Sequence, residues 1–167
     1  MRIIDRGLKK KLGRYLFQCA LATLTVLGIF FLLDVLLRAA LVSSLGATTF
    51  IVFAMPHSRT ARSRSLLGGY LLGTLCGTLC SLAADCTLAA STGLTPRVRL
   101  IIFGALAVGL TILAMVSTDA EHPPAAGLAL GFVANPWSQT TLLFVLSAVC
   151  LLSLARYLLR HILIDLV

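Results

Sequence analysis

Charged residues are scarce in this chain, and acids are scarcer than bases. Only 12% of the 167 residues are charged, with 6 Asp and Glu against 14 Lys and Arg. A soluble domain carries about 25% charged residues. This chain has about half that share of charged residues, together with 59% hydrophobic residues and a mean hydropathy of +1.00. These values exclude it from the ordinary class of soluble proteins. This composition predicts an integral membrane protein.

The motifs of soluble enzymes are also missing. The sequence has no H-E-x-x-H, G-x-S-x-G or P-loop pattern in a suitable setting, and its five cysteines include no C-x-x-C pair. Cys76 and Cys80 share a helix face, so a metal or redox pair is an alternative to the small buried hydrophobes that we expect. We predict no enzymatic activity, no catalytic residue, no metal site and no cofactor.

Six apolar segments are present, and two of them are too short to cross a bilayer as helices. We expect membrane elements at 17–37, 42–55, 66–90, 98–117, 124–135 and 138–160. Ser44 to Met55 and Pro124 to Asn135 are each 12 residues long. A 12-residue helix reaches about 18 Å, whereas the hydrocarbon core is about 30 Å thick. These two segments therefore resemble half-helices.

The two short segments also resemble each other. SLGATTFIVFAMP, which ends at Pro56, and PAAGLALGFVANP, which ends at Pro136, align at an offset of 80 residues. The same offset places 17–37 on 97–117, so the order long–short–long occurs twice. Three elements per half reverse the orientation of the second half, which is the inverted repeat of many channels and transporters.

We therefore expect a single all-α transmembrane domain over 1–167, with inverted repeats at 17–90 and 98–160. Residues 1–16 form a basic amphipathic segment that we expect to lie on anionic lipid; a nucleic-acid-binding arm is the alternative, and no nucleic-acid partner is expected. If all six elements cross the membrane, 11 of the 14 Lys and Arg fall on the side of the N-terminus. The positive-inside tendency then places both termini in the cytoplasm, with the bacterial inner membrane as the expected location.

Three glycines predict close helix packing in the third element. Gly69, Gly73 and Gly77 fall four residues apart on one helix face, which lets another helix approach closely. The partner helix belongs either to the same chain or to a second copy, and we expect a homo-oligomer.

In this topology the two half-helices begin near the middle of the membrane with their N-termini facing each other. A helix N-terminus offers unpaired N–H groups and a partial positive charge, which suits an anion. One start supplies Ser43, Ser44, Gly46, Ala47, Thr48 and Thr49, and the other supplies His122, Pro123, Pro124, Ala125, Ala126 and Gly127. We predict that these residues form the substrate-binding site or pore.

The residue types narrow the chemistry of that site. Hydroxyl groups can donate hydrogen bonds, and His122 can donate an N–H or exchange a proton. We expect the backbone amides behind Pro123 and Pro124 to matter more than the imidazole. Because neither start contains Lys or Arg, a small monovalent anion fits better than phosphate or sulfate. Asp119 and Glu121 are weaker candidates for a cytoplasmic mouth.

Three stretches resemble the HPP family of integral membrane proteins. HPPAAGLAL at His122–Leu130 is similar to the family's His-Pro-Pro run. SLGATTFIVFAMP at Ser44–Pro56 is similar to a short element that precedes this run in the family. PHSRTARSRSLLGGY at Pro56–Tyr70 is similar to the segment that follows, with Tyr70 in place of the family's His. The resemblance implies a multi-helix membrane protein and a place for Arg64 at the cytoplasmic mouth. Plastid members are described as nitrite transporters, so it also implies nitrite as the substrate.

The sequence thus predicts a transmembrane conduit for a small monovalent anion, with nitrite first among the candidates. The alternatives are a channel for another small solute and a non-transporting scaffold or sensor module. Both channels and alternating-access carriers use inverted repeats and half-helices, so the choice between them, and any proton coupling, stays open.

Overall fold

The structure, a computed structural model, is all-helical in the part of the chain that it describes, as the sequence predicts. It describes residues 13–14, 16–21, 23–25, 39–86, 93–135 and 138–166, and these contain no strand. The elements are α2 (Ala39–Ala54), the 3-10 helix η1 (Arg59–Ala61), α3 (Ser63–Asp85), α5 (Pro96–Ser117), α6 (Pro124–Ala134) and α7 (Gln139–Leu159). An apolar helix at Leu16–Thr25 is described in part. The rest of the predicted element 17–37, and the last residues of 66–90, lie outside the described residues.

The helix ends follow local sequence. α5 begins with Pro96 at its first position, where a missing N–H costs nothing, and the Thr95 side chain accepts a hydrogen bond from the amide of Val98. α2 ends at Ala54, two residues before Pro56, because proline disfavours the helical conformation of the residue before it.

Three helices are long and apolar enough to cross a bilayer. α3, α5 and α7 have 23, 22 and 21 residues, which is about 32–34 Å of helix against a hydrocarbon core of about 30 Å. α2 and α6 have only 16 and 11 residues, or about 24 and 17 Å. The prediction of long spans mixed with short helices is confirmed.

Apolar side chains cover the outside of the molecule. α3 presents a leucine stripe at helical spacing, formed by Leu71, Leu75, Leu79 and Leu82. α5 and α7 also face outward with leucines, among them Leu113 and Leu158, which are both 64% exposed. A soluble monomer rarely exposes contiguous apolar surface on this scale, whereas lipid tails match it.

Polar side chains lie inside the molecule instead. Four of them are at most 1% exposed: Gln18, Thr48, Thr111 and His122. Buried polar groups need hydrogen-bond partners, and these residues find them within the protein. An apolar exterior around a polar interior is the arrangement of an integral membrane protein.

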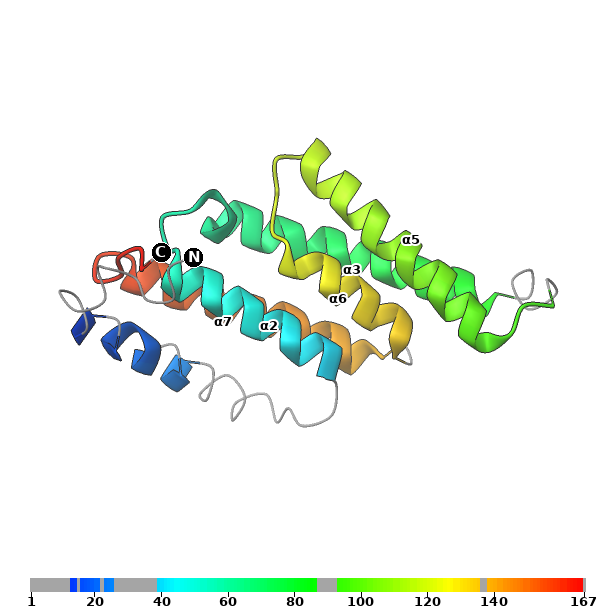
Figure 1. Ribbon diagram of the computed structural model, residues 1–167, viewed down its shortest axis with the longest axis horizontal. Helices are drawn as coiled ribbons and strands as arrows, with labels where there is room; N and C mark the ends of the chain where they lie inside the picture. Colours follow the sequence, from blue (N-terminus) through cyan, green and yellow to red (C-terminus); the bar gives the residue numbers. More distant parts are fainter. Residues whose placement is uncertain are drawn as a thin grey trace, which may run out of the picture.

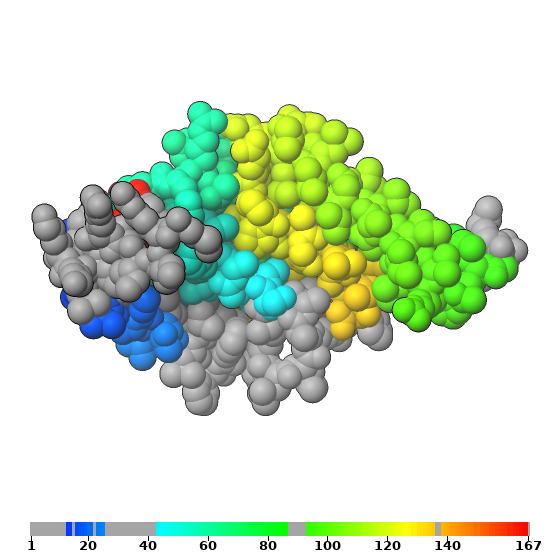
Figure 2. All heavy atoms as spheres, in the orientation of Figure 1, coloured from blue at the N-terminus to red at the C-terminus, as the bar shows by residue number. Residues whose placement is uncertain are grey.

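α6 lies at the centre of the bundle, between α2 and the α3–α5 pair (Figure 1). α3 and α6 run in the same direction, since successive turns meet in the order Gly69–His122, Gly73–Ala125 and Gly77–Ala129. α2 runs in the opposite direction. α7 packs against α2 and α3. In the space-filling view α6 reaches the surface between α2 and α5 (Figure 2).

The predicted glycine face of α3 therefore packs against α6 of the same chain. A Cβ atom added at Gly73 would lie 2.5 Å from the carbonyl oxygen of Ala125, and one at Gly77 would lie 2.8 Å from that of Ala129. No side chain fits at either position without moving a helix backbone.

Gly73→Ala is expected to lower the free energy of unfolding by about 1–3 kcal/mol, because α3 and α6 must separate to admit the methyl group. Gly46→Ala is the matched control, since a Cβ at Gly46 meets nothing within 4 Å; its stability should equal or slightly exceed that of the wild type. Unfolding equilibria in bicelles, followed by steric trapping, compare the two. Equal stabilities of Gly73→Ala and wild type would show that this contact is not tight.

The prediction of buried cysteines is wrong for most of the five. Cys80 is buried and Cys76 is half-buried, but Cys19, Cys86 and Cys150 are exposed. Hydropathy identifies an apolar segment without saying which side of the helix faces lipid, and three of these thiols lie on the outer side.

Candidate functional site

His122 precedes the first residue of α6 by two positions and is fully buried. It connects three segments that are distant in sequence. Its Nε2 atom lies 2.8 Å from Oγ1 of Thr48 in α2. Its Nδ1 atom lies 2.9 Å from the carbonyl oxygen of Thr60 in η1. The imidazole ring is tilted against the ring of Tyr70 in α3, with 5.4 Å between the centroids.

Tyr70 extends these contacts into a continuous chain of hydrogen bonds. Its hydroxyl oxygen lies 2.8 Å from Oγ1 of Thr48, and it donates to the carbonyl oxygen of Ser44 at 3.2 Å. We refer to Thr60, His122, Thr48, Tyr70 and Ser44, in this order, as the His122 chain. The side chains of His122, Thr48 and Tyr70 are buried, and Thr60 and Ser44 take part in the chain through their backbone carbonyl groups.

The His122 chain can hold the imidazole in either protonation state. A carbonyl oxygen only accepts, so Nδ1 carries a proton towards Thr60. In the neutral ring Nε2 accepts from the hydroxyl of Thr48. If Nε2 also carries a proton, Thr48 turns its hydrogen to Tyr70, and Tyr70 donates to Ser44. Only hydroxyl hydrogens rotate in this exchange, and every group keeps a partner.

The His122 chain lies about a third of the way into the helix bundle. Tyr70 follows Ser63, the first residue of the 23-residue α3, by 7 residues, which is about 10 Å along a helix of about 34 Å. The site is therefore closer to one end of the bundle than the predicted position near mid-membrane.

α6 begins without free backbone donors, which contradicts the predicted amide site. Pro123 and Pro124 have no N–H group, and Pro123 is already helical, with φ −50° and ψ −37°. The amide of Ala125 donates to the carbonyl oxygen of His122 at 2.9 Å, and that of Ala126 to Pro123 at 3.1 Å. The His-Pro-Pro sequence makes a helix start that can be buried in apolar surroundings with no orphaned donor.

α2 contributes no N-terminus to the site either. It is helical from Ala39, so the segment Ser43–Thr49 lies in its body, where amides bond to carbonyls one turn back. The start of α6 meets the middle of α2 at Thr48. The predicted pair of facing helix N-termini is wrong, because the apolar residues before Ser43 contain no helix breaker and continue the helix.

The structure brings two of the predicted side chains, Thr48 and His122, into direct contact. Thr49 donates its hydroxyl to the carbonyl oxygen of Leu45 at 2.8 Å and so supports its own helix. Of the other predicted residues, Ser44, Pro124 and Ala125 are buried, Ala126 is half-buried, and Ser43, Gly46, Ala47, Pro123 and Gly127 are exposed. The exposed members lie on the outer sides of α2 and α6.

Two largely apolar cavities flank the start of α6. The first has a volume of about 420 Å³ and is lined by His122, Glu121, Thr60, Pro123 and Ala126 together with Ile112, Met115 and Val116 of α5. The second, of about 580 Å³, lies between α2 and the two prolines, and its lining does not include His122. We call the first cavity the His122 cavity; it borders His122, which is itself fully buried.

The residues predicted for the cytoplasmic mouth lie near the C-terminal end of α5. Arg64 donates to the carbonyl oxygen of Thr118 at 3.1 Å. Asp119 has a left-handed backbone with φ 54°, which lets the amide of Ala120 bond to Met115 at 3.0 Å in the usual helix-ending motif. Glu121 is exposed and lines the His122 cavity. A mouth role for these residues stays a prediction.

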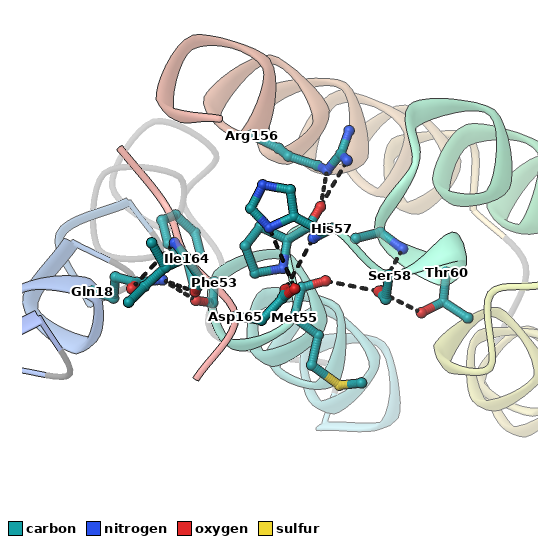
Figure 3. A network of polar contacts seen from close by, with 11 residues as sticks. Gln18, Phe53, Met55, His57, Ser58, Thr60, Arg156, Ile164 and Asp165 are labelled. Carbon is teal, nitrogen blue, oxygen red and sulfur yellow. Dashed lines mark hydrogen bonds and ion pairs between the residues drawn. The ribbon is translucent and has the colours of Figure 1, made fainter. Parts of the chain in front are cut away.

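A second polar network lies at the C-terminal end of α2 (Figure 3). The side-chain amide of Gln18 donates to the carbonyl oxygens of Phe53 at 2.7 Å and Ile164 at 2.9 Å, and it accepts from the amide of Ile164 at 3.4 Å. The amide of Leu166 donates to Ala54 at 2.8 Å. We call this network the C-terminal lock. It supplies donors to carbonyl groups that the helix end leaves unpaired.

The C-terminal lock continues into the α2–α3 connection. Asp165 accepts from the amide of His57 at 3.1 Å and pairs with its imidazole at 3.4 Å. Arg156 donates twice to the carbonyl oxygen of Pro56, at 2.8 and 3.3 Å. This connection carries Thr60, whose carbonyl group orients His122, so the lock positions one end of the His122 chain.

Several polar residues in these networks were not predicted as functional, among them Tyr70, Gln18 and Asp165. Tyr70 stands out in the sequence only as the replacement of the family's His, and Gln18 and Asp165 carry no local signal, because their partners lie 35 to 146 residues away in sequence. No group of three or more His, Cys, Asp or Glu residues that could hold a metal ion lies together in the described part of the chain.

Comparison with known proteins gives one match. The family model described as "HPP, transmembrane region" matches residues 8–164, which includes every residue of the His122 chain and most of the C-terminal lock. No curated protein and no solved structure matches the chain.

Proposed function

The chain belongs to the HPP transmembrane-region family, and from this premise we propose that it is a conduit for a small monovalent anion, with nitrite the expected substrate. We further propose that passage is linked to a proton on His122. The observation that carries the proposal is the His122 chain, a fully buried imidazole whose partners satisfy both of its protonation states.

An anion and a proton support each other at this site. A buried imidazolium is costly unless an opposite charge compensates it. Among the described residues no Lys or Arg lines the His122 cavity, so an anion that enters gains its positive partner by protonating His122. The pair is neutral together, which suits a low-dielectric interior. A monovalent anion is fully compensated by one imidazolium, whereas phosphate or sulfate would keep an excess of charge.

The His122 side chain takes over the role that the sequence assigned to backbone amides. The first amides of α6 are already bonded, so charge recognition falls to the imidazole and the hydroxyl of Thr48. Glu121 lines the same cavity, and Arg64 binds the carbonyl oxygen of Thr118 at the end of α5; these are the charged groups that we expect to bias the entry of an anion or a proton.

Arginine positions support a cytoplasmic location for one end of the bundle. Five described arginines, Arg59, Arg62, Arg64, Arg156 and Arg160, lie where α2 and α7 end and α3 begins (Figure 1). By the positive-inside tendency this end faces the cytoplasm, and the His122 cavity opens nearer to it. A bacterial inner membrane and a homo-oligomer remain part of the proposal, as does the absence of enzymatic activity.

Nitrite flux into proteoliposomes tests the proposed function. Purified wild-type chain is reconstituted, and nitrite, nitrate, formate and chloride are followed against protein-free liposomes, which account for passage of the undissociated acids through lipid. We expect nitrite to enter faster than in the empty vesicles. Equal rates for all four anions in the two preparations would reject the proposal.

One observation favours a second candidate, a non-transporting membrane module. Both cavities beside α6 have almost entirely apolar linings, whereas a water-filled pore requires a more polar lining. In that case the His122 chain would only hold α2, α3 and α6 together. The same flux measurement separates the two candidates, because a structural module gives no rate above that of empty vesicles.

A further inference from the structure

Hydroxyl groups continue along α3 beyond Tyr70. Thr74 and Thr78 follow Tyr70 at four-residue intervals, which places the three on one stripe of the helix. Ser81, only 3% exposed, extends the same stripe. It lies beside the glycine face that packs against α6 and leads from the His122 chain towards the opposite end of the bundle.

Thr74 and Thr78 differ from other threonines in the helices of this chain. Thr49 and Thr111 donate to carbonyl oxygens four residues back, at 2.8 and 2.7 Å. The hydroxyl oxygens of Thr74 and Thr78 are buried and have no hydrogen-bond partner within the described part of the chain. An unpaired buried hydroxyl lowers the stability of the fold by about 1–3 kcal/mol. Two of them on successive turns therefore favour a role in binding rather than in stability.

We propose that Thr74 and Thr78 form a second station for the transported anion, where their hydroxyl groups donate hydrogen bonds to its oxygen atoms. The inference rests on the proposed function and adds the path that leads away from His122. Thr74 lies about 6 Å and Thr78 about 12 Å beyond Tyr70 along α3. Two neutral donors bind an oxyanion weakly enough for it to leave, as conduction through successive sites requires.

The station is occluded in this structure. Both hydroxyl oxygens are sealed from solvent. An anion therefore reaches them only when the bundle opens, and access from water is the property that a purely structural threonine would lack.

Cysteine accessibility tests this inference without relying on net flux. In a background in which the five native cysteines are replaced, Thr74→Cys, Thr78→Cys and the control Thr111→Cys are reconstituted and treated with micromolar silver ions. We expect positions 74 and 78 to react about tenfold faster than position 111, because reactivity follows access, and nitrite to slow only those two reactions. Reaction as slow as at position 111, or reaction that nitrite does not slow, would overturn the inference.

Valine substitutions give a second readout that removes only the hydroxyl groups. The double variant Thr74→Val with Thr78→Val should carry nitrite about tenfold more slowly than wild type, at unchanged or higher stability, because it loses two unpaired hydroxyls. Wild-type flux in this variant contradicts the second station and leaves the proposed function standing. Absence of flux in the wild type contradicts the proposed function, while protection of the two cysteines by nitrite would still establish binding.

Discussion

His122→Gln is expected to lower nitrite flux by about 100-fold, the loss typical of removing a positioned proton acceptor. Glutamine keeps an amide donor and a carbonyl acceptor that can replace contacts to Thr60 and Thr48, but it takes up no proton near neutral pH. An anion in the His122 cavity would then lack its positive partner. The residual flux should also lose the dependence on pH that we expect of the wild type.

The control for this variant is His161→Gln. His161 is exposed beyond the end of α7, where it accepts a hydrogen bond from Arg160 at 3.3 Å, and it has no contact with the His122 chain. We expect its flux and pH profile to match the wild type in the same vesicles. A His122→Gln protein that folds and carries nitrite at the wild-type rate, with the wild-type pH profile, would remove the imidazole from the mechanism.

Gln18→Leu is expected to lower the free energy of unfolding by about 2–4 kcal/mol, because each buried polar group left without a partner costs about 1–3 kcal/mol. The substitution removes the side chain that bonds to Phe53 and Ile164, and its own position is only 1% exposed. Steric trapping in bicelles measures the loss. Hydrogen exchange at Ile164 and Leu166 should become faster, since the C-terminal lock loses its central group.

Gln139→Leu is the matched control for the C-terminal lock. Gln139 is the first residue of α7 and is exposed, so the same exchange of an amide for an apolar side chain strands no partner. We expect its stability to lie within about 0.5 kcal/mol of the wild type. Equal stability of Gln18→Leu and Gln139→Leu would show that the contacts of Gln18 contribute little.

The elements of the fold were largely predictable, because their signals are local. Pro56 ends α2, Pro96 and Pro124 start helices, and the four-residue glycine spacing on α3 indicates a close neighbour, which is α6. The sequence also predicts that the two short segments meet, whereas the inverted repeat stays a prediction. The structure has this contact between Thr48 and His122.

The chemistry of the meeting point was less predictable. Nothing in the sequence before Ser43 shows that α2 already starts at Ala39, so the sequence predicts a helix start where the structure has the middle of a helix. Whether the amides of Ala125 and Ala126 are free depends on the backbone angles of Pro123, which composition does not fix. Tyr70 joins the site only because α3 packs beside α6 at the correct level.

The membrane potential gives the most direct test of a proton-linked anion conduit. Initial nitrite uptake by the reconstituted wild type is measured under an imposed potassium diffusion potential, with and without a pH gradient. A potential of 100 mV acts on one uncompensated charge with about 2.3 kcal/mol, but not on an anion that moves with one proton. A proton-linked conduit should give a rate that follows the pH gradient and does not respond to the potential. A rate that follows the potential and ignores the pH gradient would contradict it.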